Sequence, residues 1–437
     1  MAINKKNQQE ILTKIGIEKL NQMQEDAQKA ISSNPEVILL SPTGTGKTLA
    51  FLLPIIANIN PKIKNIQVLI LVPSRELAIQ IEQVIREMGS GYKATAVYGG
   101  RSGSKDKIEL KHPPTILIGT PGRISDHINR ETIDTQQIKT LVLDEFDKSL
   151  EVGFEDEMKD ILNKLTAVQK KILTSATQKV KIPSFMELKN PKRLNFLSRK
   201  ETTLKIKTIV SQQKDKLDSL EKILGVNSKG SGIIFCNFKT SIQVVSDFLH
   251  KNSINHGCFY GDLEQIDRER TLIKFRNKTH KILVATDLAA RGIDIPELDF
   301  IIHYELPTRP DEFIHRNGRT ARMHSNGTAY ILKWKNEEFP IFIKNDEEIK
   351  IESTKKLTNS NWTTLHISGG RKDKISKGDI AGLFFKQGNI KKEELGVIEL
   401  KQDCAYVGVK NSTLHTLISK INNSKLKKKK VRISILK

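Results

Sequence analysis

The chain has 437 residues, of which 38% are hydrophobic and 28% charged, and its formal net charge is +22. That length allows two or three hydrophobic cores. No apolar run approaches the roughly 18 residues of a membrane span, and the polar start does not resemble a signal peptide. We therefore expect a cytoplasmic protein with no membrane partner, and we take a monomer as the default oligomeric state. The charge excess instead predicts a polyanionic partner, because phosphate groups attract a strongly basic surface.

Short apolar strands alternate with helical stretches twice along the chain. Strands are expected at residues 37–40, 68–72, 115–119, 140–143 and 171–174, and then at 231–236, 281–285, 300–303 and 327–332. This rhythm is typical of parallel sheets covered by helices on both faces. We predict two doubly wound α/β domains, at residues 1–200 and 207–345, with a polar connector at 198–207.

A third pattern follows a charged connector at residues 344–361. Its predicted order is strand 364–368, helix 376–386, strands 396–400 and 405–410, helix 412–422 and strand 431–436. This βαββαβ order predicts a small α+β domain of RRM-like shape at residues 362–437, here called the tail. Residues 371–437 hold 17 Lys and Arg against 6 Asp and Glu, and this excess of 11 positive charges is half of the net charge of +22. A solvated surface is the simpler explanation, but the run of lysines at 427–430 favours phosphate contacts.

The segment Ser41-Pro-Thr-Gly-Thr-Gly-Lys-Thr48 follows the first predicted strand and precedes a predicted helix. Glycines allow a tight turn whose N–H groups face inward, and a helix N-terminus attracts phosphate. Lys47 would meet the β and γ phosphates, and Thr48 would ligate Mg²⁺. The candidate nucleotide-binding residues are Thr43, Gly44, Thr45, Gly46, Lys47 and Thr48. An ordinary glycine-rich turn is the alternative.

The segment Val142-Leu-Asp-Glu-Phe-Asp147 ends another predicted strand. Parallel sheets place their ligands at the carboxyl ends of their strands. Asp144 would hold Mg²⁺, directly or through water, and Glu145 would act as base or orient the attacking water. A solvated acidic loop is the alternative, which the preceding phosphate loop makes a poor one.

Further short motifs fall where predicted strands end or helices begin. They are Pro73-Ser-Arg-Glu-Leu-Ala78, Gly99-Gly100, Thr120-Pro-Gly-Arg123, Ser175-Ala-Thr177, Phe235 to Lys239, Gly261-Asp262 with Gln265 and Arg268, Ala285-Thr-Asp287 with Arg291-Gly-Ile-Asp294, and His315-Arg-Asn-Gly-Arg-Thr-Ala-Arg322. Their order resembles that of DEAD-box ATP-dependent RNA helicases over nearly the whole chain. The resemblance implies two tandem RecA-like domains, ATP and Mg²⁺ as cofactors, and RNA as partner.

The resemblance also implies roles for matching residues. Gln24 would read the adenine edge, Asp294 would contact the nucleotide, and Arg319 and Arg322 would act as catalytic arginine fingers. Ser175, Thr177 and His315 would couple hydrolysis to domain closure. The implied RNA contacts are Pro73, Arg75, Gly99, Gly100, Thr120, Arg123 and Thr286. For the arginines, surface cations or salt-bridge partners are the alternative.

Several positions depart from the family pattern, and two of them bear on the nucleotide site. Phe146 replaces a small residue between the acidic groups, and we expect only a packing adjustment there. Asn7 stands where an aromatic side chain usually stacks on adenine, so nucleotide discrimination is expected to be weaker.

The tail segment Thr363-Thr-Leu-His-Ile-Ser-Gly-Gly-Arg-Lys-Asp-Lys374 resembles the C-terminal domain of DbpA-type bacterial helicases. That resemblance implies binding to a hairpin of large-subunit (23S-type) ribosomal RNA during ribosome assembly. Expected tail contacts are Arg371, Lys372, Lys374, Tyr406, Lys427 and Lys428, although Tyr406 serves equally well as core filler. The predicted function is local unwinding of short RNA duplexes. An ATP-dependent RNA clamp, a general RNA chaperone and a DNA translocase are the alternatives.

Overall fold

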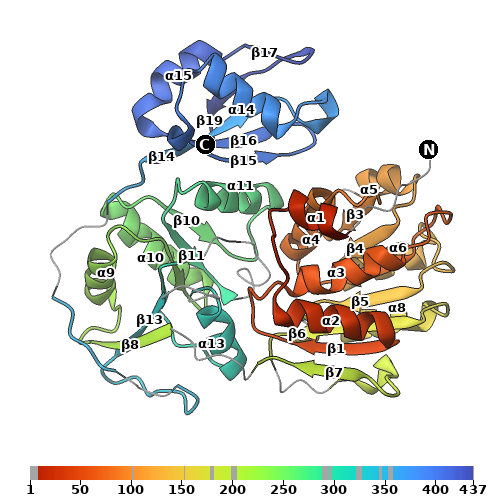
Figure 1. The fold of residues 1–437 in the computed structure, drawn as a ribbon. Coiled ribbons are helices and arrows are strands. Elements are labelled where there is room, and N and C mark those ends of the chain that lie inside the picture. Colours follow the sequence, from red (N-terminus) through yellow and green to blue (C-terminus); the bar gives the residue numbers. More distant parts are fainter. Residues whose placement is uncertain are drawn as a thin grey trace. The chain divides into compact units, whose positions relative to one another are not determined.

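The computed structural model describes residues 8–100, 103–151, 153–177, 182–197, 204–287, 295, 298–320, 327–343, 347–352 and 358–436. The chain divides into two compact units, the first ending at Thr202 and the second beginning at Thr203. The first unit holds one sheet, and the second unit holds a second core sheet and the tail (Figure 1).

The first unit, here called the first core domain, is built on a parallel sheet of seven strands in the order β3-β4-β2-β5-β6-β1-β7. The strands are β1 (Glu36–Leu40), β2 (Val68–Leu71), β3 (Ala94–Val97), β4 (Ile116–Gly119), β5 (Thr140–Leu143), β6 (Lys170–Ser175) and β7 (Lys192–Asn195). The helices are α1 (Gln8–Lys14), α2 (Gln22–Ser33), α3 (Lys47–Asn58), α4 (Arg75–Met88), α5 (Gly103–Leu110), α6 (Pro121–Asn129), α7 (Phe146–Glu151) and α8 (Glu155–Lys164), with a 3₁₀ turn at Ser184–Met186.

Both faces of this sheet are buried. Successive strand residues point to opposite faces, so Leu39 joins one apolar cluster with α2, α3 and α4, whereas Ile38 and Leu40 join another with α6 and α8. The predicted doubly wound arrangement is therefore confirmed. Its consequence is that the loops after β1, β2, β4, β5 and β6 all leave from the same edge of the sheet.

The second core domain has a parallel sheet of six strands in the order β10-β11-β9-β12-β13-β8. Its elements are β8 (Leu204–Ser211), α9 (Leu217–Val226), β9 (Gly232–Phe235), α10 (Lys239–Lys251), β10 (His256–Phe259), α11 (Gln265–Arg276), β11 (Ile282–Ala285), β12 (Phe300–His303), α13 (Pro310–Asn317) and β13 (Gly327–Trp334). The connector predicted at 198–207 is wrong in its second half, because Leu204 to Lys207 pair with β13 as part of β8. Strands β3, β7 and β10 were also not predicted.

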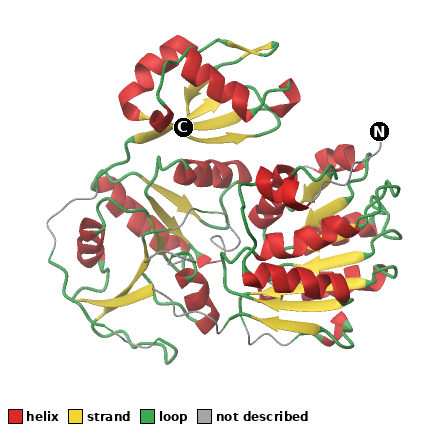
Figure 2. Ribbon diagram, viewed as in Figure 1, coloured by secondary structure: helices red, strands yellow, loops and turns green. Residues whose placement is uncertain are grey.

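The tail is a four-stranded antiparallel sheet in the order β15-β16-β14-β19. Its elements are β14 (Trp362–Ile367), α14 (Lys377–Lys386), β15 (Leu395–Leu400), β16 (Ala405–Lys410), α15 (Leu414–Ile421) and β19 (Ile433–Ile435), with short 3₁₀ turns at Arg371–Asp373, Lys392–Glu394 and Asn411–Thr413 and a hairpin of β17 (Lys425–Leu426) and β18 (Lys429–Lys430). Helices α14 and α15 cover one face of the sheet through Phe384, Leu417 and Ile421 (Figure 2). The predicted βαββαβ order is confirmed.

Membrane insertion finds no support in the described helices, none of which has the length and apolar character to cross a bilayer. The three cysteines, Cys236, Cys258 and Cys404, are free. Cys236 is buried, and the other two are half-buried.

Candidate active site and nucleic-acid interface

The phosphate loop connects β1 to α3. Gly44 and Gly46 adopt φ values of 77° and 86°, in the left-handed region that side chains disfavour. The loop folds around Lys47, whose Nζ donates to the carbonyl oxygens of Ser41 at 2.7 Å and Pro42 at 2.9 Å. Burial lowers the pKa of Lys47, and the nearby carboxylates of the acidic segment oppose that shift. The loop thus already encloses a charged group, with backbone carbonyls as its partners.

Gln24 lies against this loop from the start of α2. Its Oε1 accepts from the Asn21 N–H at 3.0 Å, and its Nε2 donates to the Gly46 carbonyl at 3.3 Å. Asn21 in turn accepts from the Gln24 N–H at 3.0 Å, so the two residues form a capping box at the helix N-terminus. The side chain expected to read adenine is therefore positioned by the helix cap and by the phosphate loop together.

The acidic segment follows β5. Asp144 is buried and accepts a hydrogen bond from the Thr174 hydroxyl, which also accepts from the Glu145 N–H at 3.2 Å. Burial, followed by the charge of Glu145, raises the pKa of Asp144 to about 6. Glu145 has a φ of 51° and pairs with Lys148, whose Nζ lies 2.7 Å from Glu145 Oε2. Lys148 is fully buried, and the sequence analysis missed it.

Asp147 connects the acidic segment to the end of β6. Its Oδ2 accepts from the hydroxyls of Ser175 and Thr177, each at 2.8 Å. Phe146, between the two acidic groups, packs in the apolar cluster with α6 and α8. A change in the acidic segment can therefore reach Ser175 and Thr177 through one shared carboxylate.

The predicted RNA contacts of the first core domain lie at the edge where β2, β3 and β4 end. The Arg75 guanidinium lies beside Gly100, whose φ is 79° and where a Cβ would fall 2.4 Å from Arg75 Nη1. Arg123 donates from Nε to Asp106 Oδ2 at 2.8 Å and from Nη1 to Asp126 Oδ2 at 3.1 Å. Pro73 lies two residues after the end of β2, Gly99 precedes Gly100, and Thr120 is the N-cap residue of α6.

In the second core domain, the predicted residues lie just after β11 and at the end of α13. Thr286 comes directly after β11, and its N–H donates to the Phe259 carbonyl at 3.3 Å. His315 and Arg319 are buried at the end of α13. Asn7, Asp294 and Arg322 lie outside the described residues.

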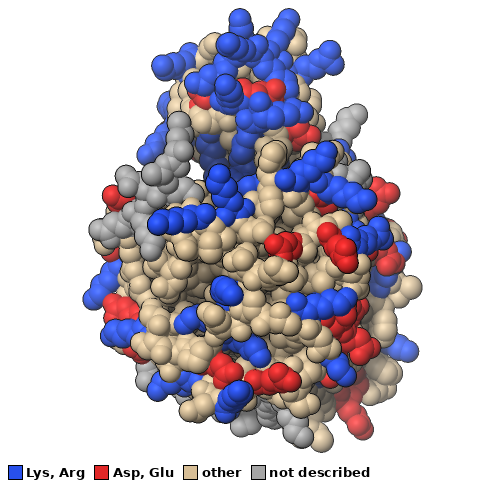
Figure 3. Space-filling model, turned by 90° about the vertical axis from the view of Figure 1, so that its right-hand side faces the viewer, with Lys and Arg blue, Asp and Glu red and all other residues tan. Residues whose placement is uncertain are grey.

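The basic residues of the tail come together from its two ends. Arg371 and Lys372 begin the tail's first 3₁₀ turn, Lys374 follows it, and Lys427 and Lys428 form the turn between β17 and β18. Ion pairs of 2.9 Å, Lys429 to Asp373 and Lys427 to Asp379, hold the two segments together. Figure 3 shows Lys and Arg side chains gathered over the tail. Tyr406 lies elsewhere, half-buried on β16, with its ring centroid 5.5 Å from that of His366.

Comparison with known proteins finds three matching families along the chain. Residues 21–184 match the DEAD/DEAH box helicases, 215–324 the helicase conserved C-terminal domain, and 364–435 the DbpA RNA binding domain. The chain is 31% identical over 444 residues to the ATP-dependent RNA helicase DbpA of Escherichia coli, covering 98% of this chain and 96% of that protein. This chain is a DEAD-box RNA helicase with a DbpA RNA-binding domain.

Two further relatives agree with the assignment of this DEAD-box helicase. DbpA of Bacillus subtilis is 30% identical over 459 residues, covering 96% of this chain and 95% of that protein. The structure of S. cerevisiae Dbp5 bound to RNA and ADP BeF3 is similar with a TM-score of 0.67 and 29% identity, covering 75% of this chain and 88% of that one. Membership of the family makes the chain an ATP-dependent RNA helicase.

The helicase's phosphate loop and acidic segment fit a nucleotide with its metal. Lys47 is a buried cation that donates to the backbone carbonyls of Ser41 and Pro42, and phosphate oxygens can replace those partners. The donor set beside it, the Thr48 hydroxyl and the Asp144 carboxylate, consists of the oxygen ligands that Mg²⁺ prefers.

One helicase residue with a central position was missed by the sequence analysis. Arg316, fully buried, donates from Nε and Nη2 to the two oxygens of Asp287 at 2.7 and 2.5 Å. It also donates to the Glu305 carbonyl and to Asn237 Oδ1, both at 2.7 Å. Arg316 therefore ties together the ends of β9, β11 and β12. The signal was present, since Asp287 and Arg316 belong to two of the recognised motifs.

Proposed function

We propose that this helicase couples RNA-stimulated ATP hydrolysis to local unwinding of short RNA duplexes, and that its tail directs it to large-subunit (23S-type) ribosomal RNA during ribosome assembly. The basic surface of the tail carries the proposal. Its exposed lysines are held in one place by ion pairs to Asp373 and Asp379, which a merely solvating charge run does not need. The proposed function is consistent with the cytoplasmic location and the monomeric state expected from the sequence.

The hydrolytic part of the proposal assigns roles to buried residues of the first core domain. Lys47 leaves the Ser41 and Pro42 carbonyls to neutralise the phosphates, while Thr48 and Asp144 hold Mg²⁺, which when bound offsets phosphate charge. The nucleotide also contacts Thr43, Gly44, Thr45, Gly46 and, at adenine, Gln24. Glu145 orients the attacking water and accepts its proton.

Residues of the second core domain complete the proposed ATP site. Arg319 and Arg322 act as arginine fingers on the transferring phosphoryl group, because planar guanidinium groups bind its oxygens in pairs. Asp294 contacts the nucleotide. Ser175, Thr177 and His315 couple hydrolysis to closure of the core domains, since Asp147 already links the acidic segment to Ser175 and Thr177.

The core is proposed to hold RNA without reading its sequence. Pro73, Arg75, Gly99, Gly100, Thr120, Arg123 and Thr286 lie where strands end and offer guanidinium and backbone groups to phosphates and 2′-hydroxyls. Arg123 exchanges a carboxylate partner for phosphate as it binds. Bending one strand costs a few kcal/mol for each unstacked step, so short duplexes open and long ones do not.

The test is steady-state ATPase activity of the full chain without RNA, with generic single-stranded RNA, and with a large-subunit ribosomal RNA fragment. We expect the ribosomal fragment to stimulate most. Lys427→Ala/Lys428→Ala should remove that preference and weaken the salt dependence of binding by a slope of about 1.4, for two lost single-strand contacts. The matched control, Lys391→Ala/Lys392→Ala, removes the same charge from another exposed site on the tail and should keep the preference.

Equal stimulation by every RNA would argue for a general RNA chaperone. Hydrolysis without strand separation would argue for an ATP-dependent RNA clamp, so unwinding of duplexes of increasing length accompanies the ATPase assay. Point substitutions are preferable to deleting the tail, because the tail covers polar side chains of the second core domain such as Asn277.

A further inference from the structure

The two faces of the tail's sheet have different surroundings. Alternate residues of a strand point to opposite faces, and one face packs on α14 and α15. The other face carries Glu399 of β15, Tyr406 and Gly408 of β16, and Thr364 and His366 of β14, with His366, Tyr406 and Glu399 in register. In an RRM-like fold this second face is the platform on which bases stack.

A charge pair joins this second face to α11 of the second core domain. Arg276 donates from Nε to Glu399 Oε1 at 2.6 Å and from Nη2 to Glu399 Oε2 at 2.8 Å. Glu399 is only 8% exposed. A bidentate guanidinium–carboxylate pair fixes orientation as well as distance, and either partner left alone would be a poorly solvated charge.

A second contact is uncharged and tightly packed. Thr364 is 1% exposed, and its hydroxyl pairs with Thr279 Oγ1 at 2.7 Å and accepts from Asn277 Nδ2 at 3.3 Å. Beside it, a Cβ at Gly408 would lie 3.3 Å from Asn277 Cγ. The sheet therefore approaches the end of α11 closely at a position that has no side chain.

The aromatic pair lies in the same interface. Tyr406 and His366 are half-buried; Arg270 of α11 affects the pKa of both side chains, and Glu269 of α11 affects that of Tyr406. Burial raises the pKa of Tyr406 and lowers that of His366. Lys401 adds an ion pair of 3.7 Å to Glu269.

The segment that leads into β14 is also attached to the second core domain. Asn359 Nδ2 donates to the Ser253 carbonyl at 3.0 Å and accepts at Oδ1 from the Asn255 N–H at 3.1 Å. Lys281 Nζ donates to the Thr358 carbonyl at 3.0 Å. The entry to the tail and the sheet face are thus held by the same domain.

We propose that the second face of the tail's sheet is a docking surface for α11 of this same chain, locked by the Arg276–Glu399 pair, and that RNA contacts the tail elsewhere. Tyr406 then belongs to the docking surface and not to the RNA contacts. The docking itself is independent of the proposed ribosomal target, whereas the placement of RNA on the basic loops rests on the proposed function.

Docking gives α11 two attachments. On its other side Arg268 is buried, with its guanidinium 4.6 Å from the centroid of the Phe259 ring and Nη1 donating to the Tyr260 carbonyl at 3.2 Å. The helix is therefore fixed both to the end of β10 and to the tail. The tail and the second core domain move as one body, so RNA held by the tail is presented to the core from a constant position.

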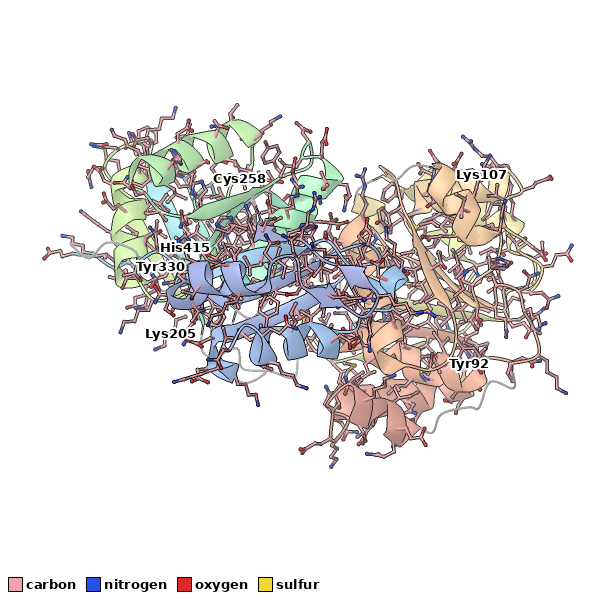
Figure 4. The ribbon with its side chains drawn as sticks, turned by 90° about the horizontal axis from the view of Figure 1, so that it is seen from above. Tyr92, Lys107, Lys205, Cys258, Tyr330 and His415 are labelled. Carbon is pink, nitrogen blue, oxygen red and sulfur yellow. The ribbon has the colours of Figure 1, made fainter. Side chains whose placement is uncertain are left out.

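Cys404 provides the test. It lies on the docking face, half-buried, and its thiol shares a hydrogen bond with Tyr406. Cys258, labelled on β10 in Figure 4, is half-buried away from this face and serves as the internal control. Labelling of each thiol by a maleimide, followed by mass spectrometry of the full chain, reports docking without relying on activity.

We expect Arg276→Glu to speed labelling of Cys404 by about tenfold or more, because it sets two carboxylates against each other. The charge swap Arg276→Glu/Glu399→Arg should restore protection, and Cys258 should stay unchanged. The matched control Lys251→Glu makes the same charge change at an exposed site of α10. Unchanged Cys404 labelling in Arg276→Glu, or a swap that fails to restore protection, overturns the docking.

The RNA arm uses the undocked Arg276→Glu variant with the generic single-stranded RNA and the ribosomal fragment in turn. Under the proposal neither RNA slows labelling of Cys404, although both bind. Protection by either RNA would make the sheet an RNA platform and overturn the placement of RNA elsewhere, while leaving the docking result standing. Protection by the ribosomal fragment alone would still support the proposed ribosomal target.

Discussion

The two core domains both bury charged side chains, but they use them differently. In the first, Lys47 is held by two backbone carbonyls and Glu145 by the ammonium of Lys148. In the second, the guanidinium of Arg316 donates hydrogen bonds to Asp287, Glu305 and Asn237. Phosphate oxygens can replace the carbonyl partners of Lys47, whereas the partners of Arg316 are complete without a ligand.

The difference shows that burial of a charge does not by itself mark catalysis. A buried charged side chain can take part in catalysis when a ligand with the same polarity as its present partners can replace them. A buried guanidinium stabilises the fold when its N–H donors bind acceptors at the ends of several strands at once. Four predictions separate the two cases.

The largest effect is expected from Glu145→Gln. The amide keeps the shape but cannot accept a proton, so RNA-stimulated hydrolysis should fall by about 10²–10⁴-fold with ATP affinity nearly unchanged. Turnover at saturating RNA and a nucleotide titration measure the two quantities. Asp156→Asn, an exposed carboxylate on α8, is the control. Retained turnover would move water activation to another residue.

Arg316→Met should act on stability instead. It leaves the Asp287 carboxylate half-buried without its partner, which costs about 3–5 kcal/mol of unfolding free energy. Asp287→Asn should also destabilise the domain. The double variant should lose less than the sum, because no unpaired charge remains. Urea unfolding of the four proteins measures the cycle, and simple additivity would contradict the assigned pairing.

His303, beside this arginine, should make the second domain acid-sensitive. Burial, and then the charge of Arg316, lowers the pKa of His303 to about 3, so below its unfolded value of about 6.5 only the unfolded chain binds the proton. Stability is therefore full above pH 6.5 and falls as pH drops. His303→Gln still reaches Asn317 and should reduce the loss between pH 7 and 5 by about 2 kcal/mol. Unfolding midpoints at both pH values decide; an unchanged pH dependence would exclude His303 as its source.

The smallest effect is expected from Lys148→Met. Glu145 loses the cation that fixes its carboxylate, and the turnover number should fall about tenfold while the KM for ATP stays the same. Single-turnover hydrolysis measures the step directly. Lys159→Met, exposed on α8, is the matched control. A change in melting temperature with turnover intact would assign Lys148 to the fold alone.

The sequence predicted what local patterns encode. The phosphate loop with Gly44 and Gly46 and the acidic segment after β5 are each defined by a few neighbouring residues. The sequence therefore predicts both loops without knowledge of their contacts. Strand β10, His256-Gly-Cys-Phe259, was missed because it begins with a polar residue and a glycine and has only four residues.

The features that the sequence did not predict depend on contacts between segments that are far apart along the chain. Arg316 and Asp287 are 29 positions apart, and Arg276 and Glu399 are 123 apart. No periodicity shows that such residues will meet, because the meeting follows from sheet order and from the packing of one element on another. The same holds for Tyr406, whose residue type suits base stacking and whose position places it against α11.

The left-handed backbone of Glu145, with φ at 51°, has a consequence for protein engineering. Holding an L-residue there costs about 1–2 kcal/mol, which glycine would avoid. This conformational cost lowers the stability of the domain, but the left-handed backbone sets the direction of the Glu145 carboxylate. Glu145→Gly should therefore be both inactive and more resistant to heat, and a selection for thermal stability alone would enrich a dead enzyme at this position.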